Sequence, residues 1–359
     1  SPKARLSAYA GYDTPKPIEK LTLNVDAARR ADLTWTAPTA TEHGGFLGSL
    51  TYDLIRITGT DTTQVANGIS DVHFAEVLPE GPLMGYRYAV RAHNQSQVTT
   101  WTNSNNAVVG SPIEPPFFDE FANAADAELY TVIDNNNDQA SWAWDKDPYT
   151  EQTAYRYHWS DTEKADDWLL LPPLRLRAGK VYTFQFKAKS NGTDYTERFE
   201  VKWGQAPNPA GLTTVILNPT EVSTDEYQTF TNELHPQADG TYYIGFHALS
   251  DAGGYYLHID SVSIAAPVAA AAPAAAENLK GKADPSGKLL TTLTFDAPKL
   301  KVDGTALSNI ERIELRNGLR LVKAFTQPMP GAALTATDNR ATTGDNVYTV
   351  IAFNADGAG

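Results

Sequence analysis

Short stretches in which apolar and polar residues alternate recur along the whole chain, and they constrain the fold more than any other feature. They are "LTLNV", "ADLTWTA", "YDLIRI", "YRYAVRA", "YTFQFKA", "RFEVKW", "YYIGFHA", "YYLHIDSVSI" and "YTVIAF". Alternation puts successive side chains on opposite faces of a β-strand. Gly, Pro, Asn and Asp bound these stretches, and 25 glycines and 22 prolines supply the turns. Long stretches of helical period are hard to find. The sequence therefore predicts an all-β protein of antiparallel sandwiches.

One module occurs twice, with other sequence between the copies. Three pairs of segments match at a nearly constant separation: "ADLTWTAP" (31–38) with "TTLTFDAP" (291–298), "GFLGSLTYDLIRITG" (45–59) with "GTALSNIERIELRNG" (304–318), and "YAVRAHN" (88–94) with "YTVIAFN" (348–354). Trp35 and Phe295 fall at the same place in the first pair. Such self-similarity indicates a repeated structural unit.

The repeated module resembles a fibronectin type III domain. The aromatic residue of its second strand, the third-strand pattern and Tyr-x-Val-x-Ala-x-Asn carry this resemblance, which covers 17–113 and 276–359. The first copy continues through "WTNSNNAVVG", but the second ends at "NADGAG" and is expected to lack its last strand. Residues 1–16 look like the tail of an upstream module. The chain has no start methionine or signal peptide, so we expect it to be a piece of a longer, exported protein.

The middle segment, 114–266, resembles the jelly-roll modules of bacterial cleaved adhesins and choice-of-anchor proteins, which are distant relatives of MAM domains. The stretches that carry the resemblance are "YTVIDNNND", "ADDWLLLPPLRLRAGKVYTFQF", "ERFEVKWG", "GTYYIGFHALSD" and "YYLHIDSVSI". Such modules lie on bacterial cell surfaces beside fibronectin-like repeats. The Ala/Pro-rich residues 267–275 are interpreted as an extended linker. The fold expected is three modules: fibronectin III-like sandwich, jelly-roll sandwich, fibronectin III-like sandwich.

Composition excludes several classes of function. The net charge of -14 disfavours nucleic acid and anionic membrane surfaces as partners, and suits cation binding or solubility. No apolar stretch approaches the ~20 residues of a membrane helix, so no membrane insertion of this segment is expected. The chain has no cysteine, which removes disulfides and thiol chemistry. It also lacks the G-x-S-x-G, H-E-x-x-H and phosphate-loop motifs. We therefore predict that it is not an enzyme.

The stretch "VIDNNNDQASWAWD" spaces acidic and amide side chains as the front half of a calcium loop does. Asp134, Asn136 and Asp138 occupy alternate positions. Gln139 stands where an EF-hand needs its glycine, and no helix follows, so an EF-hand is excluded. Two interpretations remain open. One is a structural calcium site of another kind, since Ca²⁺ takes six to eight oxygens from a flexible loop. The other is a turn whose side chains cap their own backbone.

The jelly-roll resemblance favours the calcium interpretation, because modules of this type often bind calcium between the first strand, this loop and an Asp near the last strand. It implies Asp119 or Glu120, the loop, and Asp260 as ligands. The related pattern has a second acidic residue after the final Asp and Phe-Glu near the start. This chain has Ser261 and Phe121-Ala122 at these places.

Aromatic residues are dense in the middle segment, and those proposed to contact a ligand are Trp142, Trp144, Tyr157 and Trp159. Exposed rings on a sheet stack on sugar faces. The alternative is that these rings fill the space between two sheets.

His247 and His258 flank the turn "SDAGG", and a hairpin there would place them opposite one another, close enough to share a metal. The alternative is two ordinary strand histidines, because zinc needs a third ligand.

Together these patterns predict a non-enzymatic adhesion or ligand-presentation segment of a bacterial surface protein. Its partner would be a surface protein or a glycan of the host or of a neighbouring cell. The alternative is a carbohydrate-binding accessory module of a secreted glycan-processing or proteolytic system. An exposed, planar aromatic pair in the jelly roll would favour the alternative.

Overall fold

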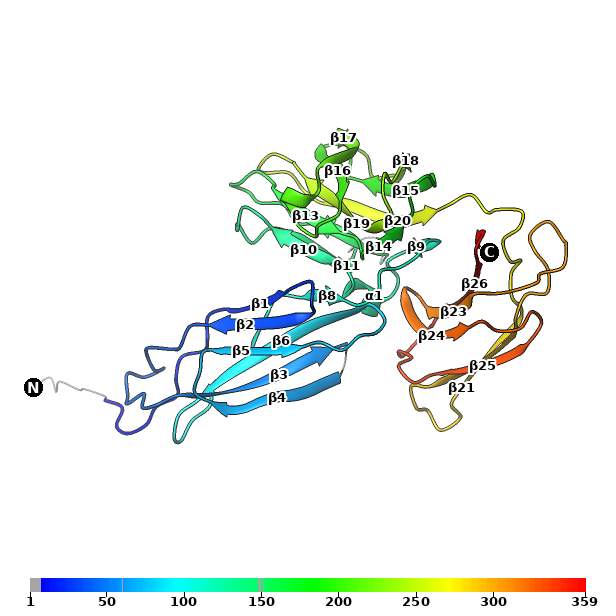
Figure 1. Cartoon of the computed structure of the whole chain (residues 1–359). Helices are drawn as coiled ribbons and strands as arrows, with labels where there is room; N and C mark the ends of the chain where they lie inside the picture. The colour runs from blue at the N-terminus through cyan, green and yellow to red at the C-terminus, as the bar shows by residue number, and fades with distance from the viewer. Residues whose placement is uncertain (1–7, 60, 148–149, 151) are drawn as a thin grey trace, which may run out of the picture. The chain divides into compact units, whose positions relative to one another are not determined.

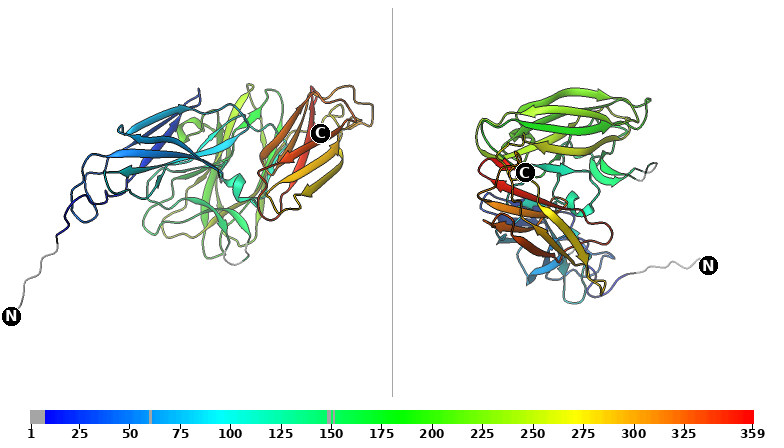
Figure 2. Two further views of the ribbon diagram at one scale, coloured as in Figure 1. Left: turned by 90° about the horizontal axis from the view of Figure 1, so that it is seen from below. Right: turned by 90° about the vertical axis from the view of Figure 1, so that its right-hand side faces the viewer.

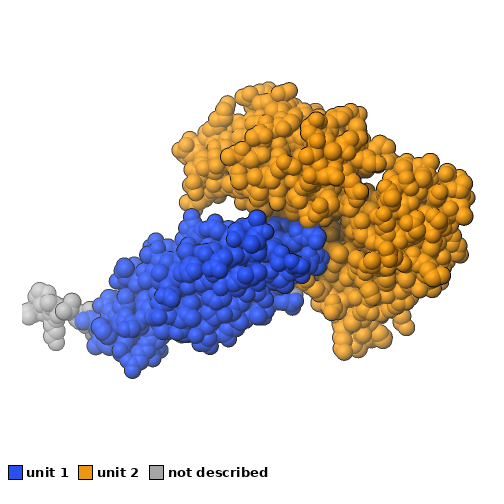
Figure 3. All heavy atoms as spheres, in the orientation of Figure 1, with its two compact units in different colours: residues 1–111 blue, residues 112–359 orange. Residues whose placement is uncertain are grey.

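The computed structural model describes residues 8–59, 61–147, 150 and 152–359, which fall into two compact units, unit 1 (Ser1–Ser111) and unit 2 (Pro112–Gly359) (Figure 3). Strands dominate both units, and the helical elements among the described residues are short: α1 (Ala124–Ala127) and the 3₁₀ turn η1 (Pro209–Gly211). The all-β prediction is confirmed, and each of the nine alternating stretches contains a strand. None of the helices described is long and apolar enough to cross a membrane.

Unit 1 consists of two antiparallel sheets whose apolar faces enclose one core. The first sheet has the order β1 (Leu21–Val25), β2 (Arg30–Trp35), β5 (His73–Val77). The second has the order β4 (Asp61–Ile69), β3 (Thr51–Thr58), β6 (Met84–His93), β7 (Thr102–Asn103), with β8 (Ala107–Val109) also pairing with β6. Trp35 and Tyr52 meet edge-to-face in this core, 5.3 Å between ring centres.

The end of unit 2 repeats this strand order. One sheet runs β21 (Glu277–Ala283), β22 (Thr291–Asp296), β25 (Ala333–Asp338), and the other runs β24 (Arg320–Thr326), β23 (Arg312–Asn317), β26 (Tyr348–Asn354), β27 (Gly357–Ala358). We call these two sheets the C-terminal sandwich. Phe295 is buried in its core as Trp35 is in that of unit 1. Where the sequence suggests a missing last strand, the short strand β27 pairs with Phe353 and Asn354.

Two six-stranded sheets form the middle of the chain, which we call the central sandwich (Figures 1 and 2). Sheet A has the order β10 (Thr131–Asp134), β13 (Asp167–Leu170), β19 (Gly240–Ala248), β16 (Glu197–Gly204), β17 (Thr214–Val222), with β14 (Leu174–Leu176) also on β19. Sheet B has the order β11 (Trp142–Lys146), β12 (Thr153–Tyr157), β20 (Leu257–Ala265), β15 (Tyr182–Lys189), β18 (Gln228–Leu234), with β9 (Phe117–Asp119) also on β20.

Alternation in the strands of both sheets sends one row of large apolar side chains into the space between them. Phe184 and Phe186 of sheet B meet Phe199 and Phe246 of sheet A, and all four have no exposed surface. Their ring centres lie 4.9–6.1 Å apart in edge-to-face and tilted pairs. This is the packing that a two-sheet sandwich needs to exclude water.

The hairpin expected at "SDAGG" is absent, so the prediction that His247 faces His258 was wrong. β19 belongs to sheet A and β20 to sheet B, so the chain crosses between layers at this turn. The apolar faces of the two strands do meet, because Phe246 and Ile259 both point into the core. The histidines consequently lie on opposite outer faces of the sandwich.

The sequence suggests that residues 1–16 are the tail of an upstream module. Residues 1–7 of that segment lie outside the described residues. The part that is described folds back on unit 1: the N–H of Asp13 donates to the carbonyl of Phe46, and Tyr9 stacks on His43 with ring centres 5.2 Å apart. The domain boundaries themselves stay a prediction.

Candidate functional site

A cavity of about 690 Å³ opens between the two sheets of the central sandwich. It lies where β17, the edge strand of sheet A, stands beside β18, the edge strand of sheet B. Neither edge strand hydrogen-bonds the other, so the sandwich is not closed on this side. The side chains that line the cavity come from β16, β17, β18 and β19 and from the loops that join them.

Strand alternation explains which residues face this cavity. Trp203 continues the inward row of β16, and Tyr242 begins the inward row of β19. On β18, Asn232 takes the inward position between Phe230 and Leu234. Asn232 is thus a polar residue at a position where the neighbouring residues of the row belong to the core. It lies where the two sheets separate. The cavity is therefore the open end of the core, lined in part by polar groups.

The cavity combines an aromatic pair with amide groups. The rings of Trp203 and Tyr242 are stacked, with centres 4.9 Å apart and planes at 25°. The hydroxyl of Tyr242 donates to the carbonyl of Ala238 at 2.9 Å, which fixes the ring. Gln237 donates to the carbonyl of His235 at 3.0 Å, and the Nδ2 of Asn232 is buried with no partner among the described residues. A buried amide without a partner carries an energetic penalty that a hydrogen-bonding ligand would relieve.

A second group of rings, the aromatic rim, lies where β12 ends and β20 begins. It consists of Trp159, Tyr195, Tyr255 and Tyr256. Tyr195 and Tyr255 are stacked at 4.9 Å and 25°, and Tyr195 is 40% exposed. The Nε1 of Trp159 donates to Asp161 at 3.0 Å. Trp159 is thus the one predicted ligand-binding residue that the structure places in an exposed aromatic group.

The other predicted ligand-binding aromatic residues are not on that surface. Trp142 is 4% exposed and Tyr157 is 1% exposed, and they pack on each other in the core. The Nε1 of Trp142 donates to the carbonyl of Asp167 at 3.1 Å. Both rings are therefore covered by the core in this structure. Trp144 is half-buried on the edge strand β11, and its Nε1 donates to the carbonyl of Phe121.

The five predicted metal ligands separate into two places. Asp134 and Asp138 lie beside Asp167, a fully buried acid that pairs with Asp134 across β10 and β13. Asn136 turns away, and its Nδ2 donates to the carbonyl of Lys164 at 2.9 Å. Asp119 and Asp260 lie on β9 and β20 and belong to a separate acidic region. Asp119 already accepts hydrogen bonds from the Phe121 N–H and the Tyr130 hydroxyl.

The Asp134 loop fits both interpretations offered for it. Asp134 caps its own turn by accepting from the N–H of Gln139, and Asp138 accepts from that of Ala140. The remaining oxygens, Oδ1 of Asp134 and Oδ2 of Asp138, are buried and unpartnered among the described residues. Burial raises the pKa of Asp167 to about 7, and the carboxylates of Asp134 and Asp138 add to the rise. A cation would offset this charge, although no three His, Asp or Glu side chains in the described ranges form a ready metal site.

We expect calcium to raise the melting temperature of the chain relative to EDTA, through the loop containing Asp134 and Asp138. At a calcium concentration 100-fold above its dissociation constant, binding to the folded form alone adds about 2.7 kcal/mol. Differential scanning calorimetry with Asp134→Ala should show no calcium response. Asn136→Ala is the matched control and should keep the response, because the Asn136 side chain points to Lys164. Equal melting of the wild-type chain in calcium and EDTA would leave the loop as a capped turn.

His247 and His258 do not form a metal pair. His247 stacks on Trp168 and lies between two carboxylates, 2.9 Å from Glu200 and 2.8 Å from Asp166. His258 is fully buried on the outer face of sheet B, and both its ring nitrogens lack partners in the described parts of the chain. Burial, together with the charge of Lys189, lowers the pKa of His258 to about 3, so this ring is neutral.

Sequence reasoning missed Trp203, Asn232 and Tyr242 as lining residues of a cavity. A signal for Asn232 exists in "QTFTNEL", where the inward row reads Phe230, Asn232, Leu234. No comparable signal exists for the aromatic pair, because Trp203 and Tyr242 both continue ordinary inward rows.

No protein-family model and no curated protein matches the sequence. Solved structures similar to part of the chain include a cleaved adhesin domain of Lys-gingipain from Porphyromonas gingivalis, with 17% identity, 42% of this chain and 97% of that chain covered, and a TM-score of 0.36. Another is the CBM22-1 xylan-binding domain from Paenibacillus barcinonensis Xyn10C, with 9% identity, 42% and 92% covered, and a TM-score of 0.32. At these values the similarity establishes neither a family nor a function for this chain.

Proposed function

We propose that this chain is a non-enzymatic, extracellular segment of a bacterial surface protein that binds a glycan in the cavity between β17 and β18. The sandwiches that precede and follow the central sandwich in the sequence would then act as spacers that present the site. This proposal combines the adhesive role expected from the sequence with the carbohydrate-binding alternative.

The observation that carries the proposal is the pairing of stacked aromatic rings with amide side chains in one cavity. The rings of Trp203 and Tyr242 are 8% and 7% exposed, and as lining residues of the cavity they offer it a small apolar surface for the C–H face of a sugar. Asn232, Gln205 and Gln237 offer donors and acceptors for its hydroxyl groups. The volume of about 690 Å³ lies within the ~300–1,000 Å³ range of small-molecule pockets. A flat acidic face would instead have supported adhesion to a protein.

The first test is a glycan array with the whole chain, followed by calorimetry with the strongest glycan found. We expect Asn232→Ala to lower the affinity for that glycan at least tenfold, because the glycan loses a hydrogen bond to a buried amide. Gln237→Ala should weaken it as well. Gln237 is exposed, and Asn232 is partly exposed where the two sheets part, so both variants are expected to fold.

Tyr195→Ala is the matched control, because it removes an exposed ring from the aromatic rim without touching the cavity. Binding that survives Tyr195→Ala and falls with Asn232→Ala supports the cavity. The reverse pattern would move the site to the rim. An array without any bound glycan would reject the function itself.

A further inference from the structure

A second cavity, of about 750 Å³, lies within unit 2 where the start of the central sandwich meets the C-terminal sandwich. One wall comes from β9, α1 and Trp144 of β11. The other wall comes from the turn after β23, the loop before β26 and the outer face of β26. Neither the glycan proposal nor the calcium prediction uses this cavity.

Ion pairs and hydrogen bonds hold its two walls together. Glu114 forms ion pairs with Arg177 at 2.9 Å and with Arg312 at 2.6 Å. Arg177 belongs to the central sandwich and Arg312 to the C-terminal sandwich. Arg316 donates to the carbonyl of Pro116 at 3.2 Å. Gly318 has a positive φ of 57°, and any side chain there would overlap the carboxylate of Asp126. These contacts hold the two walls of the cavity in place relative to each other.

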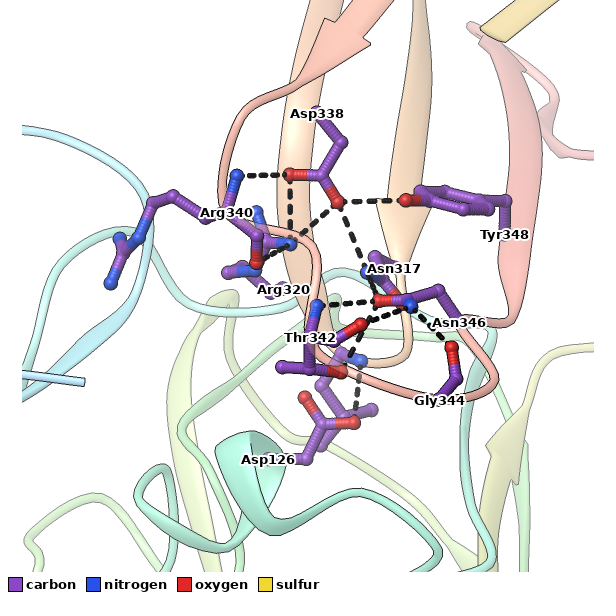
Figure 4. Close-up of polar contacts among 10 residues, drawn as sticks. Asp126, Asn317, Arg320, Asp338, Arg340, Thr342, Gly344, Asn346 and Tyr348 are labelled. Carbon is purple, nitrogen blue, oxygen red and sulfur yellow. Dashed lines mark hydrogen bonds and ion pairs between the residues drawn. The ribbon is translucent and has the colours of Figure 1, made fainter. Parts of the chain in front are cut away.

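The floor of the cavity carries buried oxygen atoms that lack partners. Asp126 is 2% exposed; its Oδ2 accepts from the N–H of Leu319 at 3.2 Å, and its Oδ1 has no partner among the described residues (Figure 4). Asn317 is equally buried, and its Oδ1 is also unpartnered within the described chain. These two oxygens come from different walls, and both are acceptors. A ligand that satisfies them must bring donors.

The charges around the floor are mostly negative. Asp119, Glu120 and Asp345 line the same cavity as Asp126. Arg316, the basic residue in the lining, already donates hydrogen bonds to Glu314 and to backbone carbonyls. Burial raises the pKa of Asp126 to about 7, with the charge of Asp119 adding to the rise. A cation in the cavity would stabilise the ionised form of this acid.

Apolar side chains form another part of the wall, beside Thr342, Thr343 and Thr349. Phe118 is 57% exposed, and Val347 is 70% exposed. Trp144, Leu319 and Ile351 complete this surface. Exposed apolar side chains around an acidic floor suit a ligand that has a hydrocarbon stem and a cationic end.

We propose that this cavity binds a basic side chain, lysine or arginine, of a partner protein. The ammonium or guanidinium group would donate to Oδ1 of Asp126 and Oδ1 of Asn317, and the methylene stem would pack on Phe118 and Trp144. The chain would then carry two separate recognition sites, one for a glycan and one for an exposed basic residue.

The test uses the whole chain and four peptides that differ in one residue: acetyl-Gly-Gly-X-Gly-Gly-amide with X as lysine, arginine, glutamine or glutamate. Calorimetry should detect the lysine and arginine peptides and neither of the others. Asp126→Asn should lower the affinity for the lysine and arginine peptides at least tenfold. The substitution removes the negative charge but keeps an oxygen that can accept from the Leu319 N–H. Phe118→Ala, which removes an exposed ring, should lower the same affinity severalfold without affecting folding.

Asp225→Asn removes an exposed acid elsewhere on the central sandwich and is the control for net charge. It should leave peptide binding within twofold of wild type. Two results would overturn the proposal: equal binding of the lysine and glutamine peptides, or full binding by both Asp126→Asn and Phe118→Ala. Glycan binding should be unchanged in these variants, so this test is independent of the first site.

Discussion

Replacing Asp338 with alanine is expected to destabilise the C-terminal sandwich by about 3–5 kcal/mol, the usual cost of removing one partner from a buried ion pair. Asp338 is 1% exposed and lies at the centre of a polar network (Figure 4). It accepts from Arg320 at 2.7 Å and from the Tyr348 hydroxyl, the Asn317 amide and the Arg340 N–H at 3.0 Å each. Without the carboxylate, four donors lose this acceptor at once; Asn317 is buried, and Arg320, Arg340 and Tyr348 are partly buried.

Urea unfolding, followed by hydrogen exchange in β25 and β26, measures this loss. Asp356→Ala, an exposed acid of the same sandwich, is the control and should change stability by less than about 0.5 kcal/mol. A loss below about 1 kcal/mol in Asp338→Ala would show that the network of Figure 4 does not hold the sandwich together.

The same network predicts the direction of a pH effect. Burial alone would raise the pKa of Asp338, but hydrogen bonds from Arg320, the Arg340 N–H and Asn317 outweigh it and lower the pKa. A carboxyl with a lowered pKa in the folded state stabilises above its unfolded pKa and loses this contribution as pH falls through the folded value. The difference between wild type and Asp338→Asn should therefore shrink below about pH 4.

Strand positions could be predicted from the sequence because alternation is a local property. "YTFQFKA" specifies an inward row containing Phe184 and Phe186, and the structure buries both completely. The repeated module is predictable for the same reason, since equal local patterns led to equal strand orders around Trp35 and Phe295.

Sheet membership could not be predicted in the same way. The turn "SDAGG" suits a hairpin, but a glycine-rich turn serves equally well where the chain crosses from one sheet to the other, as it does between β19 and β20. Only long-range pairing decides between the two. For this reason the sequence predicts His247 and His258 on one face of a hairpin, whereas they lie on opposite outer faces of the central sandwich.

Burial distinguishes the predicted site residues from one another. Trp142 and Trp144 are two residues apart and share a face of β11, yet the first is in the core and the second is half-buried at a cavity. Aromatic density in the sequence cannot separate these cases. The cavity near Asn232 depends on where two sheets part, which no local pattern records.

Phe186→Ala should be the most damaging single truncation in the central sandwich, with an expected loss of about 3–5 kcal/mol. The ring of Phe186 has no exposed surface and contacts four others, with centres 5.3 Å from Phe184, 6.0 Å from Phe199, 5.1 Å from Phe230 and 4.9 Å from Phe246. These neighbours come from β15, β16, β18 and β19, so no single loop can move to fill the hole. Phe118→Ala is the matched control, because it removes the same side chain from an exposed position and should cost far less. Hydrogen exchange of β15 and β19 during urea unfolding separates this loss from the unfolding of the other sandwiches. Similar losses in the two variants would mean that sheets A and B do not pack through Phe186.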